Sequence, residues 1–500
     1  MYISTRDNYP SMSASEVIKL GMVPAGGLFV PAEIPVLSGE EILARQGGDY
    51  QETANWLLSL FLPDFTSAEI STCVGQAYNE ENFAHPQIAP LNHFDEHIYF
   101  LELWHGPTAA FKDLALQLMP HLLSRALFKT HTEQETVILV ATSGDTGKAA
   151  LEGFKNVQGI KIIVFYPQGG VSKVQELQMT TTDGANTYVV AVKGNFDDCQ
   201  NAVKAVFADS DLSSALAKKG YALSSANSIN WGRLLPQVVY YFQSYLTLIA
   251  QGAVSPGEKI NFVVPTGNFG NILAGWYAYR MGLPVHKLIC ASNENKILTE
   301  FFHTGSYDLH REFKQTSSPS MDILVSSNLE RFLFEKTGHD AAKINRWMAD
   351  LQAKGCFAVD TGTLKSIENI LAAGYATEEE TLKAINEVFT GHAYLLDTHT
   401  AVGYRVYQKY RQQTGDQTKT VINATANPFK FSRSVLKAIQ GQDFLQGTDE
   451  FSILQALSAA SRVAVHPALC DLQVKEVLHH TVCEKEEIGQ EIKKILQCDF

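Results

Sequence analysis

The chain is organised around the stretch Leu103-Trp104-His105-Gly106-Pro107-Thr108-Ala109-Ala110-Phe111-Lys112-Asp113. After the Gly-Pro turn, apolar residues recur at helical spacing, which predicts a helix through Met119 with Thr108 as its N-cap. Lys112 then lies in an early turn, beside the apolar face. Apolar surroundings shift a lysine toward its neutral form, in which it can act as a nucleophile or base. Taken alone, the stretch favours a plain surface lysine on an amphipathic helix. Loops further along the chain shift the interpretation toward a reactive lysine.

Length and composition bound the class of protein. Five hundred residues exceed one small core and predict two or three domains. Hydrophobic residues make up 45% and charged residues 19%, which is typical of a soluble globular protein. The balance of 40 basic against 53 acidic residues, without a basic block, argues against nucleic acid as a partner. The longest apolar runs, such as 137–141 and 162–166, are too short to span a bilayer, so no membrane partner is expected.

The seven cysteines are scattered and form no C-x-x-C pair. This argues against a disulfide framework or a zinc ribbon. The N-terminus also lacks the apolar core of a secretory signal, so we expect a cytoplasmic location. No H-E-x-x-H motif and no EF-hand loop is present, and no metal is expected.

Three units are expected along the chain. Residues 1–95 form an N-terminal unit, with helices predicted at 55–61 and 67–78. From about residue 96, strands and helices alternate. Residues 96–235 are expected to form a small α/β domain with the lysine helix, and residues 236–500 a large α/β domain with a helical C-terminal tail. The alternation predicts open, mostly parallel sheets covered by helices, with ligand loops at the carboxyl ends of the strands.

Gly267-Asn268-Phe269-Gly270-Asn271 connects a predicted strand at 260–265 to a helix from Ile272. Its glycines let backbone N–H groups face an anion at a helix N-terminus. The loop lacks the Walker lysine and the G-x-G-x-x-G spacing, so it favours a single phosphate over a nucleoside triphosphate or a dinucleotide. On its own, a plain strand-to-helix turn explains the loop about equally well.

Three further features could carry chemistry. Thr142-Ser143-Gly144-Asp145-Thr146-Gly147 follows the predicted strand at 136–141 and could hold a carboxylate, although a capped helix start is the simpler explanation. Asn227-Ser228-Ile229-Asn230-Trp231-Gly232-Arg233 offers two amides, a hydroxyl and a guanidinium suited to anions, or it is an ordinary loop with a surface cation. Thr425 follows the predicted strand at 420–424, where it could bond a ring nitrogen or merely cap a turn.

Together these motifs resemble the long form of threonine synthase. His105-Gly106-Pro107-Thr108 followed by Phe111-Lys112-Asp113 is similar to the pyridoxal-phosphate lysine motif of that family, and the three loops follow in the family's order. Ser4-Thr5-Arg6, Gly27-Leu28-Phe29-Val30-Pro31 and Asp397-Thr398-His399-Thr400-Ala401-Val402 extend the resemblance, which runs from about residue 2 to about 435. It implies the second major fold type of pyridoxal-phosphate enzymes, which is tryptophan synthase β-like.

The resemblance implies conversion of O-phospho-L-homoserine and water to L-threonine and phosphate, the last step of threonine biosynthesis, by a monomer or small homo-oligomer. Lys112 would be the catalytic residue: it would hold pyridoxal 5′-phosphate as a Schiff base and, once freed, move protons on the substrate. The implied cofactor-binding residues are Lys112, Gly267, Asn268, Phe269, Gly270 and Asn271, with Thr425 facing the pyridine nitrogen. The implied substrate-binding residues are Ser143, Asp145 and Thr146 around the carboxylate, and Asn227, Ser228 and Arg233 around the γ-phosphate.

Asp145 stands where short-form threonine synthases carry Asn. A carboxylate beside an anionic substrate would have to be protonated, paired with Lys148 or turned away, and the sequence leaves these alternatives open. Two other functions also stay open: an amino-acid dehydratase or phospho-lyase of the same fold, and a non-catalytic protein that binds a phosphoamino acid. Intact Lys112, Arg233 and Thr425 favour the enzyme, because a binding module needs no Schiff-base lysine.

Overall fold

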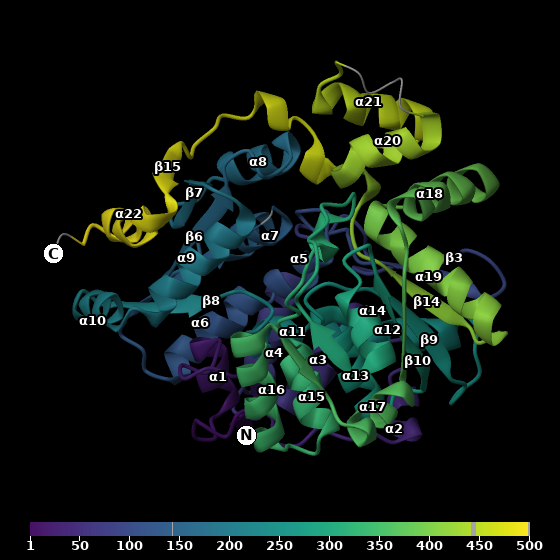
Figure 1. Ribbon diagram of the computed structural model, residues 1–500, viewed down its shortest axis with the longest axis horizontal. Helices are drawn as coiled ribbons and strands as arrows, with labels where there is room; N and C mark the ends of the chain where they lie inside the picture. Colours follow the sequence, from purple (N-terminus) through teal and green to yellow (C-terminus); the bar gives the residue numbers. More distant parts are fainter. Residues whose placement is uncertain (143, 442–446, 499–500) are drawn as a thin grey trace.

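The computed structural model describes residues 1–142, 144–441 and 447–498. Ser143, which the sequence places in a substrate loop, lies outside the described residues. The chain forms two lobes, each built on its own parallel sheet, and α5 (Lys112–Leu116) lies where they meet (Figure 1). This arrangement confirms the expected α/β architecture. Within the described part of the chain, no helix is both long and apolar enough to cross a membrane.

The large lobe contains a six-stranded sheet in the order β13-β10-β9-β14-β4-β3, in which only β3 runs antiparallel to its neighbour. Its strands are β3 (Leu91–His93), β4 (Ile98–Glu102), β9 (Ile260–Pro265), β10 (Val285–Ser292), β13 (Leu371–Tyr375) and β14 (Thr420–Ala424). Phe262 and Val264 pack in one core with α12 (Gln237–Ala250) and α13 (Gly270–Arg280), whereas Val263 packs in a second core with α19 (Thr398–Thr414). Because helices cover both faces, the central strand is a continuous apolar run rather than an alternating one.

The small lobe contains a fully parallel sheet in the order β15-β7-β6-β5-β8. Its strands are β5 (Glu135–Ala141), β6 (Ile160–Pro167), β7 (Thr187–Lys193), β8 (Tyr221–Ser225) and β15 (Thr481–Glu484). The helices around this sheet are α7 (Asp145–Phe154), α8 (Lys173–Thr180), α9 (Phe196–Ala208), α10 (Ser210–Lys218) and α22 (Ile488–Ile495). Ile138 and Val140 pack with α7 on one face, and Val137 and Leu139 pack with α9, α10 and α22 on the other.

The sheets do not follow the expected boundaries at residues 96 and 236. Strand β4 was expected in the small domain but pairs with β14 in the large sheet. The C-terminal segment was expected to be a helical cap, yet it runs from α21 (Glu450–Ser461) across α8 and adds β15 to the small sheet (Figure 1). An apolar run shows that a segment is a buried strand, but its sheet is decided by a partner far away in the chain.

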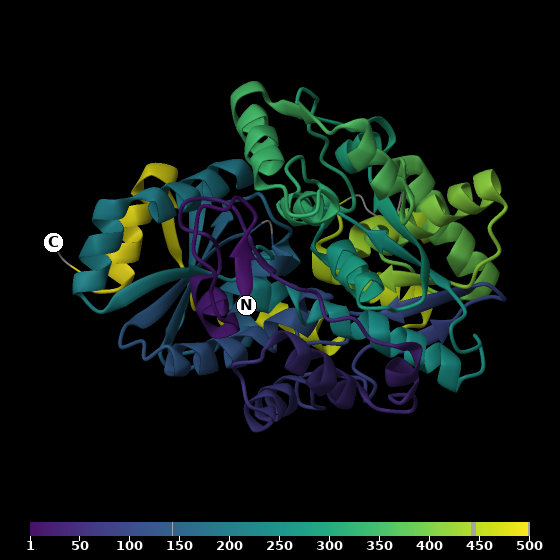
Figure 2. The same cartoon turned by 90° about the horizontal axis from the view of Figure 1, so that it is seen from below.

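The N-terminal unit contacts both lobes instead of forming a separate body (Figure 2). Its helices are α1 (Ala14–Leu20), α2 (Gly39–Leu43), α3 (Tyr50–Phe61) and α4 (Ser67–Ala77), and β1 (Tyr2–Ser4) pairs with β2 (Phe29–Pro31). Ser13, Ser38, Asp49 and Thr66 each close a capping box, which explains where these helices begin. Helix α1 packs on α6 (Met119–Lys129) and α11 (Trp231–Leu234), and α3 packs on α12.

The remaining helices and strands of the large lobe pack around its six-stranded sheet. Its further helices are α14 (Ile297–Thr304), α15 (Leu329–Lys336), α16 (Ala341–Lys354), α17 (Thr361–Glu368), α18 (Glu378–His392) and α20 (Ser432–Gln440). A small antiparallel pair joins β11 (Ser306–Asp308) to β12 (Cys356–Ala358). Between β11 and α15, a long connection carries the short 3₁₀ turn η1 (Pro319–Met321) toward the junction of the lobes.

The lysine helix is shorter than predicted, and Thr108 is not its N-cap. Helix α5 begins at Lys112, and its N-cap residue, Phe111, makes no side-chain capping bond. Thr108 instead donates from its backbone N–H and its hydroxyl to the Asp113 carboxylate, at 2.9 and 2.6 Å. The Thr108–Asp113 pair therefore closes the turn before the helix and places Lys112 at its first residue.

Helices α5 and α7 approach each other closely at Gly153. A Cβ atom at Gly153 would lie 1.9 Å from the backbone oxygen of Leu116, the last residue of α5. Only glycine permits this approach without moving backbone. This contact sets how closely the helix that begins at Lys112 packs on the helix that begins at Asp145.

We expect Gly153→Ala to lower the free energy of unfolding by at least about 2 kcal/mol, since the added methyl group meets backbone that cannot rotate away. Gly75→Ala is the matched control, because Gly75 also lies in a helix but has nothing within 4 Å of an added Cβ. There, alanine should raise stability by about 0.5–1 kcal/mol through its helix propensity. Urea unfolding measures both variants, and equal effects would contradict the close approach.

Candidate active site

A cavity of about 520 Å³ lies between the lobes, at the carboxyl ends of strands from both sheets. Ala141 of β5, Ser225 of β8 and Pro265 of β9 all contribute to its wall. The predicted site residues that line it are Lys112, Asp145, Thr146, Asn227, Ser228, Arg233, Gly267, Asn268, Phe269, Gly270, Asn271 and Thr425. The structure thus brings together the predicted site residues that it describes.

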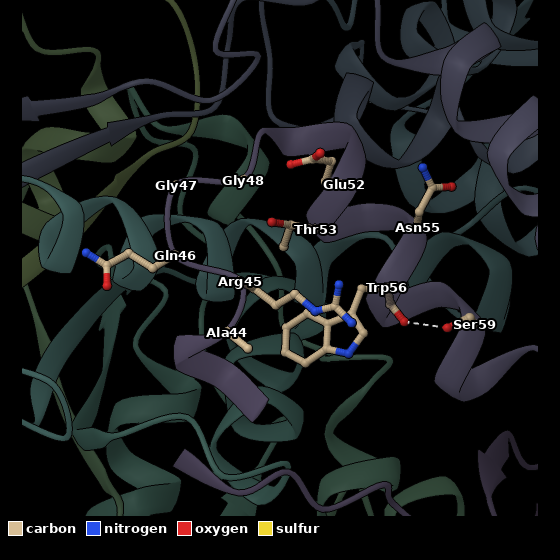
Figure 3. Close-up of a pocket in the computed structure, with 10 residues that line it drawn as sticks. All are labelled: Ala44, Arg45, Gln46, Gly47, Gly48, Glu52, Thr53, Asn55, Trp56 and Ser59. Atoms are coloured by element: carbon tan, nitrogen blue, oxygen red, sulfur yellow. Dashed lines mark hydrogen bonds between the residues drawn. The ribbon is translucent and has the colours of Figure 1, made fainter. Parts of the chain in front are cut away.

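A second hollow, of about 640 Å³, lies on the N-terminal unit (Figure 3). It is lined by Ala44, Arg45, Gln46, Gly47, Gly48, Glu52, Thr53, Asn55, Trp56 and Ser59. The Arg45 guanidinium lies 5.2 Å from the centre of the Trp56 ring. The described residues that line this hollow include no lysine and no loop at a strand end. This hollow lacks the features that chemistry at Lys112 needs, and the cavity between the lobes is the candidate site.

Lys112 is buried at the centre of this cavity. Its Nζ lies 3.5 Å from Asp145 Oδ2, donates to Ser320 Oγ at 3.4 Å, and is 5.0 Å from the centre of the Phe111 ring. Burial lowers the pKa of Lys112; the Asp145 carboxylate opposes this effect, and the charges of Lys430 and Arg233 reinforce it. The amine is therefore closer to its neutral, reactive form than a surface lysine.

Asp145 is an ion-paired carboxylate. Its Oδ1 lies 2.9 Å from Lys430 Nζ and accepts from Gln175 Nε2 at 3.0 Å, while its Oδ2 accepts from Ser320 Oγ at 3.2 Å. Burial favours its protonated form, but the charges of Lys430 and Lys112 outweigh burial and hold the pKa of Asp145 well below its usual range. Asp145 therefore stays ionised without presenting an unpaired negative charge to the cavity.

Of the three alternatives that the sequence left open for Asp145, neither protonation nor pairing with Lys148 is observed. Lys148 points along its own helix, where its ammonium pairs with Glu152 and donates to Thr182 Oγ1 at 2.9 Å. The actual partner, Lys430, is fully buried in the short turn η2 (Pro428–Phe431) and also donates to the backbone oxygen of Thr108 at 2.8 Å. The sequence analysis missed Lys430. A lysine inside an apolar turn, five residues after Thr425, was the signal available.

The loop before α13 is shaped as an anion cradle. A Cβ at Gly267 would lie 2.7 Å from the backbone oxygen of Ser320, so the loop tolerates only glycine there. Phe269 adopts φ +63°, in the left-handed region, immediately before the helix begins at Gly270. The first N–H groups of a helix have no partner within it, and its dipole favours negative charge at this end.

Asn271 and Thr425 complete the cradle. The side-chain oxygen of Asn271 accepts from Tyr240, Tyr241 and Asn423 at 2.8, 2.7 and 3.1 Å. Its Nδ2 is buried and finds no hydrogen-bond partner among the described residues. A buried donor without an acceptor is costly, and an oxygen of a bound phosphate would satisfy it. Thr425 lies beside the lysine, since its backbone oxygen accepts from the N–H of Phe111 at 2.9 Å.

Arg233 places a buried guanidinium in the wall of the same cavity. Its side chain is only 4% exposed, and its Nη1 donates to the backbone oxygen of Ala226 at 2.6 Å. Among the described residues, no carboxylate lies within 4.0 Å of it. Burial lowers the pKa of Arg233 to about 10, opposed by Asp113, so the group remains charged at neutral pH. A buried charge without a counter-ion favours binding of an anion.

Two residues that the sequence analysis missed hold the loops in place. Arg331 is fully buried and donates to the backbone oxygens of Ser228 and Ile229. Asn328 donates to Ser228 Oγ at 2.9 Å and to the backbone oxygen of Asn268 at 3.1 Å. Asn328 therefore links the loop that carries Arg233, residues 227–233, to the glycine loop at residues 267–271. No local pattern marks either residue, because both act through loops distant in sequence.

Comparison with known families agrees with this site. The family model described as pyridoxal-phosphate dependent enzyme matches residues 85–426, and models of the threonine synthase N terminus and C-terminal region match residues 1–78 and 400–477. The chain belongs to the threonine synthase family of pyridoxal-phosphate dependent enzymes. Threonine synthase of Pseudomonas aeruginosa is 40% identical over 445 residues, covering 88% of this chain and 91% of that protein. Human threonine synthase-like 1 is 39% identical over 521 residues, covering 100% of this chain and 69% of the human protein.

Solved structures of threonine synthases share the fold. The pyridoxal-phosphate-bound enzyme of Brucella melitensis superposes with a TM-score of 0.87 at 38% identity, covering 99% of this chain and 98% of that one. The yeast enzyme also superposes with a TM-score of 0.87, at 31% identity over the same shares of the two chains. The cofactor of this family member is pyridoxal 5′-phosphate. Its cavity fits that group, because a buried lysine lies beside a cradle with an unpartnered amide donor.

We expect Lys430→Met to lower the free energy of unfolding by about 3–5 kcal/mol, because it leaves a buried carboxylate without its nearest cation. Adding Asp145→Asn should recover part of the loss. Lys485→Met is the matched control, since the Lys485–Asp198 pair has the same 2.9 Å separation but is solvent-exposed, and should change stability by less than about 1 kcal/mol. Denaturant titrations of the four proteins test this, and similar losses in both single variants would contradict it.

Proposed function

We propose that this protein converts O-phospho-L-homoserine and water to L-threonine and inorganic phosphate. The observation that carries the proposal is the second anion site, where the buried guanidinium of Arg233 has no carboxylate partner among the described residues. The cradle at α13 is suited to the phosphate of the cofactor, which leaves Arg233 for a phosphate on the substrate. The names of the relatives, threonine synthase, support the same substrate.

In this proposal, Lys112 Nζ attaches the cofactor, residues 267–271 surround its phosphate, and Thr425 faces its ring. Pyridoxal phosphate, when bound, supplies an electron sink that acidifies the hydrogens next to the substrate's amino group. A neutral hydroxyl at Thr425, in place of a carboxylate, would leave the ring nitrogen weakly protonated. Asp145 does not repel the substrate carboxylate, since Lys430 pairs with it at 2.9 Å and balances its charge. Thr146 and the N-terminus of α7 then face the carboxylate.

Lys112 moves the protons of the reaction. Its lowered pKa suits an amine that accepts protons from Cα and Cβ and returns them later. The bond between Cγ and the phosphate oxygen breaks, Cγ gains a proton, water adds its hydroxyl at Cβ, and Cα is reprotonated. Arg233, with Asn227 and Ser228, neutralises the charge that develops on the departing phosphate, which is an interaction strongest in the transition state.

The first test is turnover of O-phospho-L-homoserine by the purified, cofactor-loaded chain, with phosphate and amino-acid product both measured. Equal amounts of phosphate and threonine are expected. Phosphate with 2-oxobutyrate would instead identify a phospho-lyase of the same fold. Absence of both products would contradict the proposal and favour a non-catalytic protein that binds a phosphoamino acid.

We expect Lys112→Ala to abolish both turnover and the visible absorbance of the lysine-bound cofactor, because Lys204, the other lysine among the described residues that line the cavity, is exposed on α9. Borohydride reduction of the loaded wild-type protein should fix the cofactor on the peptide that contains Lys112, as mass spectrometry would show. Lys148→Ala removes another buried lysine, one that does not line the cavity, and should keep the absorbance. Cofactor found on a different lysine would overturn the assignment.

Arg233→Met should retain the cofactor absorbance but lower kcat/KM for O-phospho-L-homoserine by about 10²–10³-fold, the usual effect of losing one donor to a developing charge. Arg233→Lys keeps the charge and loses the forked geometry, so it should recover only part of the activity. Steady-state kinetics distinguish the two variants. An unchanged kcat/KM in Arg233→Met would remove Arg233 from the substrate site.

A further inference from the structure

Ser320 is the cavity residue in closest contact with Lys112 that the preceding sections leave without a role. It lies in η1, on the connection between β11 and α15, and it reaches the cavity from the large lobe. Its hydroxyl accepts from Lys112 Nζ at 3.4 Å and donates to Asp145 Oδ2 at 3.2 Å. The hydroxyl, the amine and Asp145 Oδ2 therefore form a triangle, in which the hydroxyl and the amine, 3.5 Å from Oδ2, face the same carboxylate oxygen.

The remaining contacts of Asp145 show how the Ser320 hydroxyl affects the contact between Lys112 and Asp145. Its Oδ1 is occupied by Lys430 and Gln175, both within 3.0 Å. Oδ2 is thus the oxygen open to Lys112, and the Ser320 hydroxyl already binds it. Lys430 reaches Asp145 at 2.9 Å, a normal ion-pair distance, whereas Lys112 stays 0.6 Å further away. A lysine in full contact with a buried carboxylate would be held protonated, and a protonated lysine can neither attach a cofactor nor accept a proton.

A buried His–Asp pair fixes the turn that carries Ser320. The backbone N–H of Ser320 donates to His399 Nε2 at 3.2 Å. Because Nε2 is the acceptor, the ring proton is on Nδ1, which donates to Asp397 Oδ1 at 3.0 Å. Asp397 also accepts the backbone N–H of His399 at 2.8 Å as the N-cap of α19, and both side chains are almost fully buried. The turn is therefore anchored to the helix that covers the large sheet.

The opposite side of the turn packs against the glycine loop at residues 267–271. The backbone oxygen of Ser320 occupies the space beside Gly267 that a Cβ would fill. The turn is thus held between Gly267 and His399 and has little freedom to shift away from Lys112.

We propose that Ser320 is a positioning residue for Lys112: its hydroxyl competes with the amine for Asp145 Oδ2 and keeps the ion pair between Lys112 and Asp145 long, and the Asp397–His399 pair holds the hydroxyl there. The effect of Ser320 on turnover rests on the proposed function, whereas its effect on the protonation of Lys112 does not. The charged groups that face Lys112 are Asp145 from α7, Lys430 from η2 and Arg233 from α11. Of these, only Asp145 would tighten its contact if the hydroxyl were removed.

The test measures how fast the cofactor-stripped full chain takes up pyridoxal phosphate as a function of pH, since only the neutral amine reacts. In Ser320→Ala, Lys112 closes on Asp145, and the profile should move to higher pH by about one unit, which corresponds to about tenfold slower uptake at neutral pH. With the reloaded protein, kcat for O-phospho-L-homoserine should fall about tenfold with little change in KM.

Four variants sharpen the test. Ser320→Thr keeps a hydroxyl and should restore the wild-type profile. Ser317 lies on the same connection, but its hydroxyl donates to Glu378 outside the cavity. Ser317→Ala should therefore keep the wild-type uptake profile. His399→Leu releases the turn and should shift the profile in the same direction as Ser320→Ala, so it also tests the proposal if Ser320→Ala does not fold. In His399→Gln, the side-chain amide oxygen can accept from the Ser320 N–H, so this variant should restore the wild-type uptake profile.

An uptake profile of Ser320→Ala that is unchanged or moves to lower pH would overturn the proposal, because the hydroxyl would then act only as an acceptor for the ammonium. Uptake requires no substrate. If even the wild-type protein fails to turn over O-phospho-L-homoserine, the proposed function falls while the uptake profiles still decide the role of Ser320.

Discussion

An excess of buried positive charge around Lys112 is the constraint on which the rest of the site depends. Lys112, Lys430 and Arg233 are all buried near one another, and the carboxylates that face them are Asp145 and Asp113. Burial raises the pKa of Asp113 to about 6, so its negative charge is itself held at a cost. This imbalance lowers the pKa of the lysine and makes the cavity attract anions, within a chain whose net charge is −13.

The fold concentrates these charges by bringing two parallel sheets together end to end. The carboxyl ends of β5 and β8 in one lobe and of β9 and β14 in the other all open into the same cavity. Helices that follow such strands point their N-termini at the ligand, as α7 and α13 do here. The chain crosses between the lobes several times, through β4 and α5 near the start and through the segment that carries β15 near the end.

Polar side chains behind the cavity give its loops a single arrangement. Arg331 and Asn328 hold the loop of Arg233 against the glycine loop at residues 267–271. The Asp397–His399 pair holds the turn that carries Ser320. None of these residues needs to touch a ligand to matter. Buried, hydrogen-bonded polar groups of this kind restrict the alternatives open to the backbone, and the proposed binding of two phosphates requires such restriction.

The sequence by itself determined the α/β class and the strand before and the helix after each loop of the cavity, since these depend on local patterns such as apolar runs and glycines. The membership of the cavity from Lys112 to Thr425 was expected from the resemblance to threonine synthases, and the structure brings the described residues together. Tertiary structure alone decided which sheet β4 and β15 join, that Thr108 bonds Asp113 instead of capping a helix, and that Asp145 pairs with Lys430 and not Lys148. Each of these depends on partners brought together by packing over long separations. Local spacing favours a neighbour such as Lys148 three residues away, but burial and helix geometry give that lysine to Glu152, and only the assembled cavity places Lys430 and Ser320 beside the same carboxylate.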